Sequence, residues 1–150
     1  MLFRSHLPGG MLQDMGASSV LVKNTANLKG IDAAEINGKY VFEQAKAGDA
    51  DCIKAIEDMV HVLGMGIANI CYVVNPEIVV LGGGIMAQKD YLEPLIQKSI
   101  NQCLIKSVAR NTKIAFAVNQ NRAGMLGAYY HFLSRRNIFS VKTNELEDSI

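Results

Sequence analysis

Cysteine is scarce in this 150-residue chain, and its spacing argues against two classes of small protein. The three cysteines, Cys52, Cys71 and Cys103, are odd in number and form no CxxC pair. A disulfide framework or a thiolate zinc site needs paired, closely spaced cysteines. We therefore expect free thiols in a reducing compartment, which favours a cytoplasmic location.

Charge of either sign is also low, at 19% of residues, and Lys+Arg 15 against Asp+Glu 14 leave a net charge of +1. No stretch concentrates enough basic residues to follow a phosphate backbone, which argues against direct nucleic-acid binding by this chain. The amino terminus has no basic stretch followed by a long apolar one, so the sequence predicts no signal peptide.

The most apolar stretch, residues 59–74, is shorter than the 18 or more apolar residues that a membrane span needs. It continues a helical stripe of apolar residues spaced three and four apart: Ile53, Ile56, Val60, Leu63, Ile67, Ile70 and Val74. Asp49 is a typical N-cap residue, and Pro76 disfavours a helical residue before it. We expect one long helix between them, exposed at its start and enclosed at its end, where Gly64, Gly66 and Ala68 let a second backbone approach closely.

The chain then alternates strands and helices. A β-branched run at 78–81 predicts a buried strand, and the capping-box spacing of Asp90 and Glu93 predicts a helix of about three turns. Residues 113–118 predict a second strand, and residues 124–133 predict another helix. Residues 17–28 and 38–47 are further candidate helices, and residues 1–3 are a candidate third strand. This order predicts an α/β fold with a parallel sheet. Because so small a sheet has unpaired edges, we expect the chain to be part of a larger domain.

Three glycines, Gly82, Gly83 and Gly84, follow the first of these strands. Glycine at the carboxyl end of a parallel strand lets a ligand lie against bare backbone, and the N–H groups of the following turn can face phosphate. A tight turn without a ligand has the same sequence, so both interpretations stand. His61 and His131 lack a partner at ligand-like spacing, which favours packing or surface roles.

Three segments together resemble the carboxyl-terminal half of the ROK family of repressors, open reading frames and sugar kinases: NPEIVVLGGGI at 75–85, TKIAFAV at 112–118 and RAGMLGAYYHFL at 122–133. The segment DMGAS at 14–18 resembles the Glu-x-x-Ala-Ser segment of the family. The resemblance implies the carboxyl-terminal part of an actin-like ATPase (ribonuclease H-like) domain, helix-rich with a small parallel sheet. It implies a partial lobe over residues 1–136 and a polar tail over residues 137–150.

The resemblance also implies site residues. Gly82, Gly83 and Gly84 match the loop that lies beside ATP or ADP in family kinases, whose complete form also uses magnesium. Asp14 stands where the family has a glutamate that contacts sugar hydroxyls; it keeps the acceptor charge but is one methylene shorter. The zinc-binding run of the family is absent from residues 7–12, as in the zinc-lacking β-glucoside kinase-like members, so no zinc is expected.

The phosphate loop and the catalytic aspartate of the family would lie ahead of residue 1, so we expect no catalytic residue in this chain and no activity from it alone. The leading interpretation is the carboxyl-terminal segment of a sugar kinase that phosphorylates a hexose or a β-glucoside. The alternatives are the lobe of a sugar-responsive ROK transcriptional regulator and a non-catalytic oligomeric remnant. Open sheet edges and an apolar helix predict a homo-oligomer.

Overall fold

The computed structural model describes residues 18–118 and 122–135. The candidate strand at 1–3, Asp14 and the tail at 137–150 lie outside the described residues. The elements in chain order are α2 (Ser18–Lys29), η1 (Ala33–Glu35), α3 (Gly38–Lys46), α4 (Ala50–Val74), β1 (Ile78–Leu81), η2 (Gly84–Gln88), α5 (Lys89–Cys103), α6 (Lys106–Ala109), β2 (Lys113–Phe116) and α7 (Ala123–Arg135).

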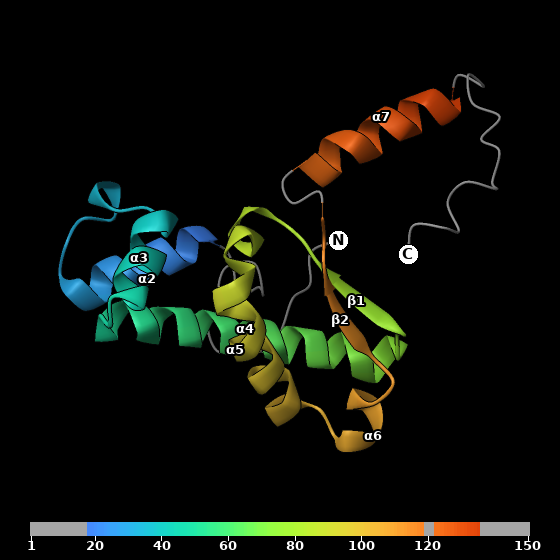
Figure 1. The fold of residues 1–150 in the computed structure, drawn as a ribbon, viewed down its shortest axis with the longest axis horizontal. Coiled ribbons are helices and arrows are strands. Elements are labelled where there is room, and N and C mark those ends of the chain that lie inside the picture. The colour runs from blue at the N-terminus through green and yellow to red at the C-terminus, as the bar shows by residue number, and fades with distance from the viewer. Residues whose placement is uncertain (1–17, 119–121, 136–150) are drawn as a thin grey trace.

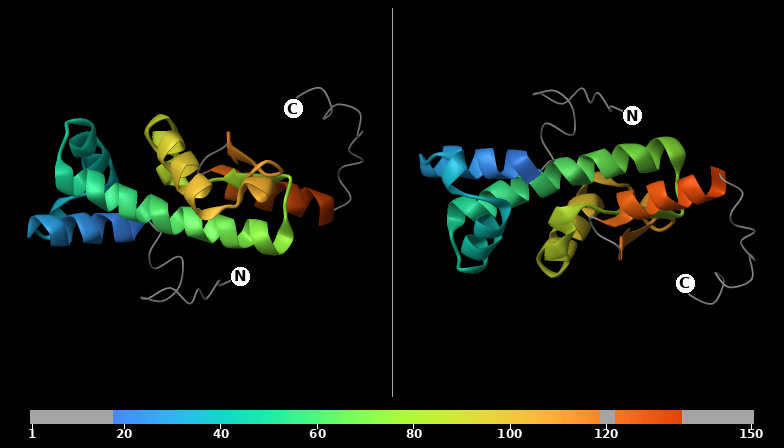
Figure 2. Two further views of the ribbon diagram at one scale, coloured as in Figure 1. Left: turned by 90° about the horizontal axis from the view of Figure 1, so that it is seen from below. Right: turned by 90° about the horizontal axis from the view of Figure 1, so that it is seen from above.

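Helix α4 runs along the length of the molecule and organises it (Figures 1 and 2). α2 and α3 pack on its amino-terminal half, α5 crosses its middle, and the sheet lies beside its carboxyl-terminal half. By length and composition α4 could cross a membrane, but its buried side packs against these elements as a core helix does. The helices and strands predicted within the described residues are confirmed, whereas the sequence does not predict α6, η1 or η2.

Local capping sets both ends of α4, as predicted. The side chain of Asp49 accepts a hydrogen bond from the backbone N–H of Cys52, and Asn75 ends the helix in the left-handed conformation at φ 47°. Asp49 also pairs with Lys29 at the end of α2, which joins the two helices. The hydrogen bond from Lys29, followed by that from Cys52, lowers the pKa of Asp49 from 3.8 to about 2.

The buried stripe of α4 differs from the predicted one. Ile56, Val60 and Ile67 are buried as predicted, but the last turn is open, and Val73 is 85% exposed. The prediction of an enclosed second half is therefore confirmed up to Cys71 and wrong for the last turn. The last turn is open because α5 crosses α4 near the middle of the helix, so no described element covers its outer side.

Where α5 crosses α4, the helices touch almost backbone to backbone. A Cβ added at Gly64 would lie 2.1 Å from Ser99 Oγ, 2.8 Å from Ser99 Cβ and 3.2 Å from the Ser99 carbonyl carbon. The predicted close approach at the small residues of α4 is confirmed here. The contact leaves Ser99 Oγ buried without a hydrogen-bond partner among the described residues.

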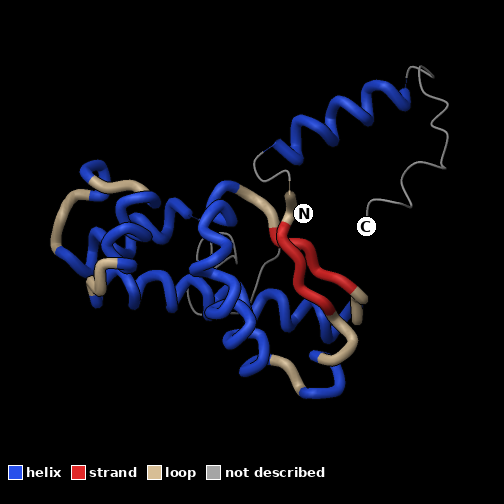
Figure 3. Tube along the Cα trace, viewed as in Figure 1, coloured by secondary structure: helices blue, strands red, loops and turns tan. Residues whose placement is uncertain are grey.

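The sheet consists, in the described part of the chain, of β1 and β2, which pair in parallel with Ile78 opposite Lys113 and Leu81 opposite Phe116 (Figure 3). Val79 and Leu81 pack into the core, but Ile78 and Val80 point to the other face and are 52% and 58% exposed. The prediction of a strand buried on both faces is wrong, because helices α4 and α5 cover one face only.

Two details of the later helices also differ from the predictions. α5 begins one residue before Asp90 and continues directly from η2, with Gln88 at the N-cap position and no side-chain cap, so the predicted capping box does not form. Pro94 consequently lies beyond the first turn. α7 is helical as predicted but stands away from the body, with large apolar side chains exposed along it: Met125, Leu126, Tyr129, Tyr130 and Phe132.

Candidate functional site

The three glycines form the turn that carries the chain from β1 into η2. Gly83 adopts φ 103° and ψ 167°, a conformation that side-chain-bearing residues rarely adopt, and its carbonyl accepts the N–H of Met86 at 3.2 Å. The backbone N–H of Ala117 donates to the Leu81 carbonyl at 2.8 Å, which ties the start of the turn to the end of β2. The backbone therefore requires glycine at Gly83, whereas a Cβ at Gly82 would make an ordinary 3.6 Å contact with Ala117.

A pocket of about 820 Å³ opens where this turn meets the amino-terminal ends of α2 and α3. Its volume lies in the usual range for small-molecule sites, about 300–1,000 Å³. Four elements line it. The residues that determine the polarity and charge of its wall are Val22, Lys23, Ile36, Lys39, Phe42, Gly84, Ile85 and Gln88. None of its described lining residues is acidic, and its two ammonium groups belong to Lys23 and to Lys39, whose Nζ also lies 3.6 Å from the Glu43 carboxylate. The pocket therefore offers an apolar wall with cationic groups and suits an anionic ligand with an apolar body.

Two contacts hold the wall of this pocket together. The rings of Phe42 on α3 and Tyr91 on α5 meet edge to face, with centroids 5.9 Å apart and planes at 84°. Lys46 Nζ, at the end of α3, donates a hydrogen bond to Gln88 Oε1 at 2.8 Å. Both contacts join α3 to the segment that follows the glycine turn.

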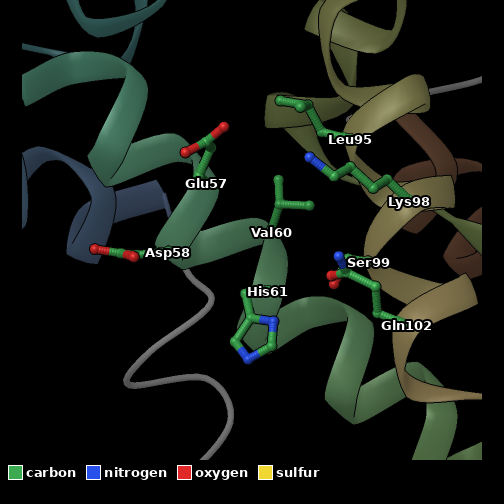
Figure 4. Close-up of a pocket in the computed structure, with 8 residues that line it drawn as sticks. All are labelled: Glu57, Asp58, Val60, His61, Leu95, Lys98, Ser99 and Gln102. Atoms are coloured by element: carbon green, nitrogen blue, oxygen red, sulfur yellow. The ribbon is translucent and has the colours of Figure 1, made fainter. Parts of the chain in front are cut away.

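A second cavity, of about 240 Å³, lies between α4 and α5 and is lined by Glu57, Asp58, His61, Lys98 and Gln102 among others (Figure 4). These charged and polar side chains are exposed, and Asp58 pairs with Lys54 at 3.0 Å. No group of three His, Cys, Asp or Glu residues in the described ranges could hold a metal ion. The larger pocket, beside the glycine turn, is therefore the better candidate site.

Of the site residues predicted from sequence, Gly84 lines the larger pocket, and Gly82 and Gly83 form the turn that leads to it. Asp14 lies outside the described residues. His131 and the Tyr129–Tyr130 pair are exposed on α7 and line none of the pockets described above. Sequence reasoning missed Phe42 and Lys46 on α3 and Gln88 on η2, because the two elements are far apart in the chain and no local pattern marks these residues.

The ROK family model matches residues 15–135 of the chain. The chain is 48% identical over 129 residues to an uncharacterised protein of Clostridium perfringens, covering 86% of this chain and 44% of the relative. It is 32% identical over 118 residues to the β-glucoside kinase of Listeria monocytogenes, covering 79% of this chain and 38% of that enzyme. It is also 29% identical over 93 residues to the xylose repressor of Caldicellulosiruptor bescii, covering 62% of this chain and 23% of the repressor.

Solved structures show the same fold. A ROK family protein from Streptococcus pneumoniae in complex with sucrose matches with a TM-score of 0.73 at 21% identity, over 86% of this chain and 44% of that one. A ROK glucokinase from Streptomyces griseus in complex with glucose and AMPPNP matches with a TM-score of 0.69 at 24% identity, over 81% of this chain and 44% of that one.

The chain thus spans less than half the length of these relatives. Its described residues have the helix-rich architecture with a small parallel sheet that is found in the actin-like ATPase fold of ROK sugar kinases. With the family model matching most of its residues, the chain belongs to the ROK family.

Proposed function

We propose that this chain is the nucleotide-binding, carboxyl-terminal part of a ROK sugar kinase. In the complete protein, the γ-phosphate of ATP would pass to a hydroxyl of a hexose or a β-glucoside. The observation that carries the proposal is the glycine turn at Gly82–Gly84, which opens into a pocket of nucleotide size. The likeness to a β-glucoside kinase supports the sugar class.

The chemistry of the pocket supports a nucleotide as its ligand. Val22, Ile36, Phe42 and Ile85 provide apolar surface against which a purine base can pack, and the lysines favour phosphate charge. Magnesium would enter with the phosphates, because proteins usually hold it through phosphate oxygens, waters and only one or two carboxylates. The Streptomyces glucokinase binds AMPPNP within the same fold, which is consistent with this assignment.

The remaining roles in the reaction fall to other parts of the proposed kinase. Phosphoryl transfer needs a positioned base and positive or metal charge around the γ-phosphate. By resemblance, the base and the phosphate loop belong ahead of residue 1, and Asp14 contacts a sugar hydroxyl. Residues 1–136 would form the partial lobe and 137–150 a polar tail, in a cytoplasmic protein with access to ATP.

A protein made of these 150 residues should bind ADP weakly and phosphorylate no sugar, because only one side of the cleft is present. Calorimetry with ADP and a coupled assay with glucose, cellobiose and other β-glucosides measure both properties. ADP binding without turnover is the expected result. Sugar-dependent turnover above a Gly83→Val preparation would contradict the assignment of catalysis to residues outside the chain.

A transcriptional regulator lobe is the second candidate, and the likeness to a xylose repressor favours it. Such a lobe would bind a sugar effector without needing a nucleotide. The same titrations separate the two functions: xylose or glucose binding in the absence of any ADP binding would favour the regulator and contradict the kinase proposal.

We also propose that the chain associates with itself through its uncovered apolar surfaces. Three apolar side chains are more than half exposed: Val73 in the last turn of α4, and Ile78 and Val80 on β1. Helix α7 exposes further apolar side chains. Surfaces of this kind favour association. Light scattering over a concentration series should show a dimer or larger species; a monomer at every concentration, with cooperative unfolding, would contradict self-association.

A further inference from the structure

Gln88 occupies a particular position at the candidate site, between two hollows. It lines the large pocket together with Gly84 and Ile85, and it also lines a smaller cleft of about 320 Å³ together with Lys46 and Tyr91. Lys46 lines only the smaller cleft. The side chain of Gln88 therefore forms part of the partition between the two hollows, and Lys46 contacts it from the side of the smaller one.

The hydrogen bond from Lys46 determines which way the Gln88 amide faces. An ammonium group can only donate, so the atom 2.8 Å from Lys46 Nζ is the amide oxygen, Oε1. The amide nitrogen, Nε2, is then at the other end of the group, and it donates no hydrogen bond to a described residue. A free glutamine side chain could instead present either its oxygen or its nitrogen to a ligand.

We propose that Gln88 contacts the base of the bound nucleotide by donating from Nε2 to a ring nitrogen or carbonyl oxygen, and that Lys46 is the positioning residue that holds the amide in this orientation. This inference rests on the proposed nucleotide function of the pocket. The charge of Lys46 on Oε1 also polarises the amide and strengthens Nε2 as a donor.

The expected effects follow from the exposed position of this pair. Lys46→Met should weaken ADP binding about threefold, because the amide then rotates freely, and Gln88→Leu should weaken it about tenfold by removing the donor. Lys46→Arg keeps a cationic donor and should keep most of the affinity. If Lys46 acts through Gln88, adding Lys46→Met to Gln88→Leu should cause no further loss.

The test is a titration of the whole chain with ADP, followed by NMR amide shifts, with pyrophosphate as a second probe that has no base. Lys54→Met and Gln97→Leu are matched controls, since these residues make exposed pairs with Asp58 and Asn101 that do not involve the pocket. We expect the controls to bind ADP like the unsubstituted chain, and Lys46→Met and Gln88→Leu to leave pyrophosphate binding unchanged.

Additive losses in the double variant, or equal losses for ADP and pyrophosphate, would overturn the positioning role while leaving nucleotide binding in place. Failure of the unsubstituted chain to bind ADP would overturn the proposed function and this inference with it. Thermal unfolding of each variant identifies any loss of affinity that comes from misfolding.

Discussion

Gly83→Val should weaken ADP binding by at least about tenfold, the largest functional effect that we expect from a single substitution. Gly83 has φ 103°, and holding a β-branched residue there costs on the order of 1–3 kcal/mol. The turn would relax away from this conformation and carry Gly84 and Ile85, which line the pocket, with it. Titration with ADP, by calorimetry or by NMR amide shifts, measures the loss.

Gly48→Val is the matched control for this substitution. Gly48 has φ 95° and, like Gly83, no atom within 4 Å of an added Cβ, but it does not line the pocket and lies two residues after Lys46. It should lose similar stability and lose no more ADP affinity than the about threefold expected for Lys46→Met. If Gly83→Val binds ADP as well as Gly48→Val does, the nucleotide lies elsewhere in the molecule.

Gly64→Val should destabilise the fold by about 3 kcal/mol, because overpacking a tight helix crossing forces backbone movement. An added Cβ would lie 2.8 Å from Ser99 Cβ and 3.2 Å from the Ser99 carbonyl carbon, and neither atom can be moved by rotating the serine hydroxyl. The free energy of unfolding in urea measures the effect. A domain of ordinary stability, about 5–15 kcal/mol, would lose a large part of its margin.

Three further variants separate the effect of crowding at the helix crossing from the effect of replacing a helical glycine. Gly127→Ala changes a helical glycine of α7 that has open space around it, so it should be neutral or stabilise by up to about 1 kcal/mol. Gly64→Ala should destabilise, and Ser99→Gly in the same chain should restore part of the loss by removing the opposing Cβ. Additive losses in that double variant would show that the crossing is not crowded at this point.

The sequence by itself determined the elements whose limits are set by their own residues. The ends of α4 follow from the Asp49 side chain, which caps the first turn, and from Asn75 and Pro76, which stop the last one. The glycine turn after β1 was also predictable, because consecutive glycines directly after a β-branched run are a strong local signal of a turn. These interactions span only a few residues, so the sequence of a short segment is enough to predict where the helix and the turn lie.

The tertiary structure alone decided which faces are covered and where a pocket forms. The exposure of Ile78 and Val80, and of Val73 at the end of α4, depends on where α5 crosses, which no local pattern records. The pocket brings together residues from α2, α3 and η2, and the bond from Lys46 to Gln88 spans 42 positions in the chain. Contacts between residues so far apart in the sequence depend on how whole helices and strands pack against one another, so a local sequence pattern does not predict them.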